Sequence, residues 1–169
     1  GLKPPYPDGM QEGEAKHHLW EHSQLSSASK EYIQRLPYKL ELEREKNKIL
    51  VLHYAMDYNN NYINGKSNPT LYDCKNMFAD YNADIILYGH RHMPSFISSD
   101  KKMYINCGSL GCPHNFEGIA KGGILTLNEN NVSFEPIKVP YDLNQVIQHI
   151  DNIRYSDYEF IKKIFYGVK

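Results

Sequence analysis

The sequence predicts an α/β fold, and three observations support this. Two short apolar runs rich in β-branched residues, at positions 48–52 and 84–88, are typical of strands in a sheet that is covered on both faces. Between them, apolar residues recur every three or four positions over residues 70–81, which indicates an amphipathic helix. This order of strand, helix and strand is typical of a β-α-β unit.

The composition is that of one globular domain, expected to span residues 1–169. Hydrophobic residues make up 41% and charged residues 23% of the chain, which is ordinary for a folded protein. The net charge of -1 and the scattered Lys and Arg residues do not indicate a nucleic-acid partner. The apolar runs are far too short to span a bilayer, and residues 1–20 contain no apolar segment typical of a signal peptide. No membrane association is therefore expected.

The three cysteines, Cys74, Cys107 and Cys112, favour a cytoplasmic location. Their odd number and the absence of C-x-x-C spacing are not typical of a disulfide framework. An alternative is a zinc site in which Cys107 and Cys112 join His90 and His92. It is the less favoured interpretation, because structural zinc sites usually use closely paired cysteines.

The first 43 residues are expected to contain two helices and an edge strand. Residues 14–25 and 27–36 have helical patterns, and both helices are expected to cover one flank of the sheet. His18 and His22 are four residues apart, but without an H-E-x-x-H motif a solvated polar face is the favoured interpretation. Residues 38–43 alternate between apolar and charged, which predicts an edge strand in a hairpin with residues 48–52.

The remaining segments complete the fold. Residues 57–69 are polar and rich in Asn and Tyr, so they form either a rim over a site or a surface loop without a role. Two hairpins are expected from residues 96–98 with 102–105 and from residues 122–127 with 132–136. Two amphipathic helices come next, at residues 143–153 and 158–166. The last helix is expected to bury four side chains, those of Phe160, Ile161, Ile164 and Phe165.

Histidines and an asparagine follow three of the predicted strands. His53 comes directly after one strand, His90 and His92 follow the next, and Asn106 ends a third. Ligands collect where the carboxyl ends of neighbouring strands meet in an open α/β sheet. Neutral imidazole is the commonest metal ligand, although a His-x-His pair by itself is more often part of a surface loop. Together, the three strand ends predict a metal site.

These residues resemble the late motifs of the calcineurin-like metallophosphoesterases, which are a lone His after a strand, G-H-x-H and N-x-G-S-x-G. The matching stretches are Leu52-His53-Tyr54, Gly89-His90-Arg91-His92 and Asn106-Cys107-Gly108-Ser109-Leu110-Gly111. Val139-Pro140-Tyr141-Asp142 is similar to the V-P-Y-D of the small bacterial and archaeal branch that includes the YfcE-like phosphodiesterases. The resemblance covers essentially the whole chain, and it implies a two-sheet sandwich flanked by helices (α/β/β/α).

The resemblance also implies a dinuclear site for two divalent ions (Mn, Fe, Zn or Ni). By the family pattern, His53 and His90 bind one ion and His92 binds the other. Asn106, Gly108 and Ser109 are expected to shape the supporting loop and to accept hydrogen bonds from ring N–H groups. Arg91 is expected either to stabilise phosphate charge or to face solvent.

The early motifs of the family are absent from these residues. No D-x-H, G-D-x-x-D or G-N-H-D/E motif occurs, and the Pro- and Gly-rich lead-in at residues 1–13 resembles the segment directly after G-N-H-D in family members. The chain is therefore expected to be the C-terminal two-thirds of a metallophosphoesterase domain, without its N-terminal strands and without a catalytic residue of its own.

This pattern supports two functions. The first is metal-dependent hydrolysis of small phosphoesters, mono- or diesters, at a site to which this chain contributes the histidine half. The alternative is a non-catalytic scaffold that binds at most one metal ion, because three neutral imidazoles hold two divalent ions poorly. An exposed sheet edge would also favour a homo-oligomer or pairing with the missing N-terminal part.

Overall fold

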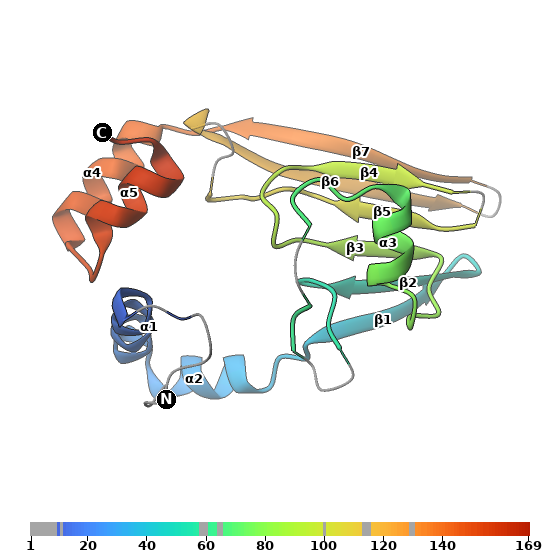
Figure 1. Cartoon of the computed structure of the whole chain (residues 1–169), viewed down its shortest axis with the longest axis horizontal. Coiled ribbons are helices and arrows are strands. Elements are labelled where there is room, and N and C mark those ends of the chain that lie inside the picture. The colour runs from blue at the N-terminus through green and yellow to red at the C-terminus, as the bar shows by residue number, and fades with distance from the viewer. Residues whose placement is uncertain are drawn as a thin grey trace. The chain divides into compact units, whose positions relative to one another are not determined.

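The computed structural model describes residues 10, 12–57, 61–63, 66–99, 101–112, 116–128 and 131–169 (Figure 1). The chain divides into two compact units. One consists of residues 1–36, 115–118 and 142–169, and the other of residues 37–114 and 119–141. A compact unit is not by itself an independently folding domain, so the expectation of a single domain stays a prediction. Most of the lead-in expected at residues 1–13 lies outside the described residues.

The second unit contains a five-stranded sheet with the order β1-β2-β3-β5-β4. The strands are β1 (Lys39–Arg44), β2 (Asn47–Leu52), β3 (Ile85–Tyr88), β4 (Ser95–Ser98) and β5 (Met103–Asn106). β2, β3 and β5 are parallel, whereas β1 and β4 pair antiparallel at the two edges. This topology confirms the predicted edge hairpin and the β-α-β unit, and it brings the carboxyl ends of three strands to one edge of the sheet.

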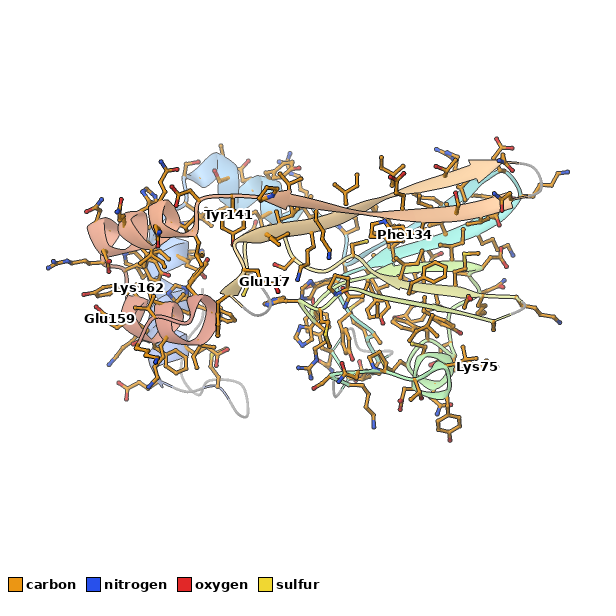
Figure 2. All side chains as sticks on the ribbon, turned by 90° about the horizontal axis from the view of Figure 1, so that it is seen from above. Lys75, Glu117, Phe134, Tyr141, Glu159 and Lys162 are labelled. Atoms are coloured by element: carbon orange, nitrogen blue, oxygen red, sulfur yellow. The ribbon has the colours of Figure 1, made fainter. Side chains whose placement is uncertain are left out.

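Both faces of this sheet are covered within the second unit. On one face, Cys74 and Met77 of α3 (Leu71–Met77), together with Phe78, pack on the apolar side chains of β2 and β3. On the other face, side chains of β6 (Ile119–Asn128) and β7 (Asn131–Pro140) pack against the sheet. Figure 2 shows the β6–β7 ribbon, which carries Phe134, and the helix that carries Lys75 on opposite sides of the sheet. The predicted two-sheet α/β fold is confirmed.

One expected hairpin belongs to the other sheet. Residues 96–98 and 102–105 were expected in the second sheet, but β4 and β5 lie in the five-stranded one. The physical reason is burial: Tyr104 and Ile105 point to opposite faces of β5 and are 2% and 0% exposed, so this strand needs an interior position beside β3. Among the described residues, the second sheet is formed by β6 and β7 alone.

The first unit contains α1 (Glu12–Gln24), α2 (Ser27–Gln34), α4 (Leu143–Ile153) and α5 (Tyr158–Tyr166). The bounds of α4 and α5 match the prediction, but the expected burial along α5 is partly wrong. Phe160 and Ile164 are 59% and 49% exposed, and the buried residue of α5 is Lys162, which forms ion pairs with Asp151 of α4 and with Glu159. The expectation that α1 and α2 flank the sheet stays a prediction. No helix within the described parts of the chain has the length and apolar character needed to cross a membrane.

Candidate metal centre

Two histidines meet at the carboxyl edge of the five-stranded sheet. His53 directly follows β2 and His90 lies two residues beyond β3, and these strands are parallel neighbours. The backbone N–H of Gly89 donates a hydrogen bond of 2.8 Å to the His53 carbonyl, which extends the pairing past the strand ends. The His90 Nδ1 atom lies 3.3 Å from the His53 Nε2 atom, with the two ring planes at 85°. The structure therefore brings together two imidazoles that are 37 residues apart in the sequence.

A tight turn directs the His90 ring toward His53. His90 has a φ of +67°, in the left-handed region that non-glycine residues rarely occupy. The N–H of Arg91 donates a 2.7 Å hydrogen bond to the carbonyl of Gly89, which closes the turn around His90. Such backbone strain costs on the order of 1–3 kcal/mol and is concentrated at functional sites. This conformation is a physical reason to treat the turn as part of a site.

Asn106 holds the turn of His90 in place through hydrogen bonds to its backbone. It ends β5, is 2% exposed, and its side-chain amide donates hydrogen bonds to the carbonyl of Arg91 (2.8 Å) and to that of Gly89 (3.3 Å). Its Oδ1 atom accepts a bond of 2.9 Å from the N–H of Gly108. These bonds go to the backbone, and not to the histidine ring N–H groups as the motif predicts. Asn106 thus positions the histidine turn through the main chain.

Gly108 and Ser109 lie in the neighbouring loop after β5. Gly108 has a φ of +87°, and a Cβ atom there would lie 2.8 Å from Pro94 Cγ and 2.9 Å from Lys121 Cβ, so no larger residue fits without a shift. The Ser109 hydroxyl accepts a 3.0 Å hydrogen bond from the N–H of Cys112, and its carbonyl accepts one of 2.8 Å from Lys121. The loop after β5 is therefore fixed both to the histidine turn and to β6.

Two tyrosines flank the imidazole pair, and neither was predicted as a site residue by itself. The buried Tyr54 ring lies 4.8 Å from the His90 ring, measured between centroids. Tyr62, which is 53% exposed, lies 5.6 Å from His53 and 6.2 Å from His90. A β-bridge between Met56 and Tyr62 folds the chain back at this point. Residues 61–63 therefore border the site, which favours the rim over the loop without a role; residues 58–60, 64 and 65 lie outside the described residues.

The surroundings of His90 favour its neutral form. Partial burial lowers the pKa of His90 below its ordinary value, and the nearby positive charges of His53, Arg91 and His92 lower it further. A metal ligand must be deprotonated at the nitrogen that binds, so a lowered pKa leaves the imidazole available near neutral pH. His92 is therefore near enough to His90 for its charge to lower the pKa of that ring.

The imidazole pair fits two positions around one divalent ion. With metal–nitrogen bonds of about 2.05 Å, two nitrogens 3.3 Å apart subtend an angle of about 107° at the metal, close to tetrahedral. No group of three or more His, Cys, Asp or Glu side chains suited to a metal forms among the residues that the structure describes. His92 consequently does not complete a three-ligand set with the pair and stays a predicted ligand. The donor set fits part of a mononuclear site and does not by itself fit two ions.

The side chain of Arg91 lines a small cavity next to the histidine turn. The cavity has a volume of about 190 Å³, and Tyr88, Ser95 and Asn106 also line it. The hydroxyl groups of Tyr88 and Ser95 lie 3.3 Å apart, and burial raises the pKa of Tyr88 to about 12, so this phenol stays neutral. Arg91 is half-buried. Both expectations for Arg91, stabilisation of phosphate charge and a solvent-facing position, therefore stay predictions.

Comparison with known proteins gives one family and a common fold. The model of the calcineurin-like phosphoesterase superfamily domain matches residues 12–130. A hypothetical protein of Pyrococcus horikoshii is 20% identical, with a TM-score of 0.75 over 95% of this chain and 63% of its own. A metallophosphoesterase of Sphaerobacter thermophilus is 16% identical, with a TM-score of 0.68 over 95% of this chain and 72% of its own. At these identities the likeness concerns the fold. A search among curated proteins found no match.

Proposed function

This chain belongs to the calcineurin-like phosphoesterase superfamily, and from this premise we propose that it takes part in metal-dependent phosphoester hydrolysis. In the proposal, His53 and His90 are ligands of one divalent ion, and His92 is a ligand of a second. The observation that supports it best is the 3.3 Å separation between His90 Nδ1 and His53 Nε2 at the carboxyl edge of the sheet. Members of the family normally bind divalent metal ions.

The remaining ligands would come from elsewhere. A pair of neutral imidazoles does not neutralise two divalent cations, and carboxylates are the usual oxygen donors that do so. The chain spans 63% of the length of the Pyrococcus horikoshii protein. We therefore propose that carboxylate ligands from polypeptide outside residues 1–169, or from another chain, complete the site.

Bound divalent metal would supply Lewis acidity toward the phosphate and a hydroxide near neutral pH. The residues of this chain have supporting roles. His53 and His90 hold the ion, and Asn106 keeps the turn of His90 in place through the carbonyls of Gly89 and Arg91. Tyr54 and Tyr62 flank the imidazoles.

Titration with Co²⁺ tests the proposed ligands, because its visible absorption reports coordination number and nitrogen ligation. We expect His53→Ala and His90→Ala each to weaken binding at least about 100-fold. His149→Ala is the matched control, since His149 is exposed on α4 and belongs to the other unit. Equal Co²⁺ affinity in the parent and in the His53 and His90 variants would show that these histidines are not metal ligands.

Hydrolysis of bis-p-nitrophenyl phosphate with Mn²⁺ separates the proposal from the non-catalytic scaffold. We expect residues 1–169 to bind metal but to turn over the diester only when the polypeptide that carries the carboxylate ligands is present. If turnover does not appear under either condition while Co²⁺ still binds, the scaffold is the correct function.

A further inference from the structure

The outer edge of β1 presents an alternating strand to solvent. β1 ends the five-stranded sheet, and among the described residues no strand pairs with its other side. Leu40 and Leu42, on one face of β1, are 48% and 41% exposed, and Tyr38, directly before β1, is 70% exposed. An exposed strand edge with an apolar face is a template for pairing with another strand.

The opposite face of β1 carries charges of both signs. Lys39 and Glu41 form a salt bridge of 2.6 Å, and Glu43 lies next along the same face. The segment from Tyr38 to Glu43 therefore has one apolar face and one face with opposite charges two residues apart. When two copies of this strand pair antiparallel, the apolar face of one copy can lie beside the apolar face of the other, and opposite charges can lie across from each other.

Symmetry restricts how two copies of β1 can pair. A two-fold axis perpendicular to the sheet makes the strands antiparallel, and residues directly opposite each other then share a face. The axis must therefore pass through a residue that faces itself in the partner. Pairing of β1 with β4, the other edge, would not close and would lead to an open-ended filament.

Most registers place like charges together. An axis at Lys39, Glu41 or Glu43 sets a charged residue opposite itself. At Glu41 this like-charge pair lies at the centre and counteracts the two Lys39–Glu43 pairs of the same register. An axis at Leu42 sets Glu41 opposite Glu43 twice. Like charges directly opposite in a sheet are destabilising. These registers are therefore unfavourable.

An axis at Leu40 satisfies both faces. Lys39 then lies opposite Glu41 of the second copy, twice by symmetry, and Tyr38 lies opposite Leu42, also twice. The apolar faces form one stripe of six side chains with Leu40 against Leu40 at its centre. Opposite-charge pairs and aromatic–aliphatic pairs are the cross-strand pairs that stabilise a sheet.

We propose that two copies of this chain associate through β1, antiparallel about an axis at Leu40, so that their five-stranded sheets form one continuous sheet. Neither the imidazole pair nor bound metal takes part. A single strand pair is expected to bury less surface than the roughly 1,200 Å² of a standard interface, so the association is expected to be weak.

Sedimentation equilibrium from about 5 to 500 μM tests the association. We expect the average mass to rise with concentration from the monomer value of 19.7 kDa toward twice that value. A mass that stays at the monomer value up to 500 μM overturns the proposal. Far-UV circular dichroism checks that each charge variant retains the fold.

Two charge reversals test the register. Lys39→Glu and Glu41→Lys each convert two opposite-charge pairs into like-charge pairs, so each alone is expected to weaken dimerisation at least about tenfold. An equimolar mixture of the two variants has opposite charges at both pairs again, in a heterodimer. Recovery of parental affinity in the mixture is the expected result, and no recovery contradicts the register.

Glu43→Lys is the matched control. Glu43 is exposed on the same face of β1 as Glu41, but in the proposed register it lies beyond the charge pairs, opposite Pro37. Its reversal is expected to change the dimer dissociation constant less than about twofold. A loss of affinity as large as that of Glu41→Lys overturns the axis at Leu40.

Discussion

Replacement of Asn106 by Leu is expected to destabilise both the fold and the metal centre. The change keeps the side-chain size but removes two hydrogen bonds to the carbonyls of Gly89 and Arg91 and one from the N–H of Gly108. A buried hydrogen bond contributes about 1 kcal/mol net, so the free energy of unfolding should fall by roughly 2–4 kcal/mol. Because the turn of His90 loses its support, Co²⁺ affinity should fall by about 10- to 100-fold.

Urea denaturation followed by far-UV circular dichroism measures the first effect, and Co²⁺ titration measures the second. Asn82→Ala is the control, because Asn82 is exposed in the same unit and its replacement should change stability by less than about 0.5 kcal/mol. An Asn106→Leu protein with the parental stability would refute the role of the hydrogen bonds. Lower stability with unchanged Co²⁺ affinity would refute the link between Asn106 and the imidazole pair.

Three further changes test the fold around the site and in the first unit. Gly108→Ala should lower the free energy of unfolding in urea by about 1–3 kcal/mol, because Gly108 combines a φ of +87° with close neighbours, whereas Gly111→Ala, with nothing within 4 Å, should have little effect; equal effects would contradict the steric argument. Hydrogen bonds from Thr70 lower the pKa of Asp73 below 3.8, so its stabilisation is complete above that pH and is lost as the pH falls through the folded-state pKa. Asp73→Asn should therefore reduce the loss of stability in thermal melts from pH 5 to pH 2, and an unchanged acid profile would count against this capping interaction. Asp151 raises the pKa of Lys162 above 10.5, so the stabilisation by Lys162 is present below that pH and is lost as the pH rises through the folded-state pKa. Lys162→Met should lower the melting temperature at pH 7 and flatten its decline from pH 9 to pH 12; a melting temperature equal to the parent's at pH 7 would be inconsistent with a stabilising ion pair.

Elements defined by local interactions could be predicted from the sequence. The bounds of α4 match because its signals are local: Asp142 caps the helix by accepting a 3.0 Å hydrogen bond from the N–H of Gln145, and apolar residues recur at helical spacing. The positions of His53 and His90 were also predictable, because each follows an apolar strand and parallel strands end at one edge of the sheet.

Features that depend on contacts between distant residues could not be predicted. Whether the β4–β5 hairpin belonged to one sheet or the other depended on which strand β5 would pair with. The carbonyl groups to which the Asn106 amide donates belong to residues 15 and 17 positions away. Nothing in the sequence indicates that this amide bonds to the backbone and not to an imidazole ring. Tyr62 reaches the imidazoles only because the chain folds back through the bridge to Met56. In α5, Lys162 is buried together with its ion pairs, whereas hydrophobicity predicted burial of Phe160 and Ile164.

The proposed function depends most on a single metal ion bound between His90 and His53. Long-range ¹H–¹⁵N correlation spectra of the histidine rings, recorded during titration with Zn²⁺, observe each ring nitrogen separately. We predict that His90 Nδ1 and His53 Nε2, the two atoms 3.3 Å apart, both move to the chemical shifts of metal-bound nitrogen at one equivalent of Zn²⁺. Unchanged chemical shifts of the ring nitrogens of both residues at one equivalent of Zn²⁺ would contradict the proposed metal site. Binding through His90 Nε2 or His53 Nδ1 would contradict it as well.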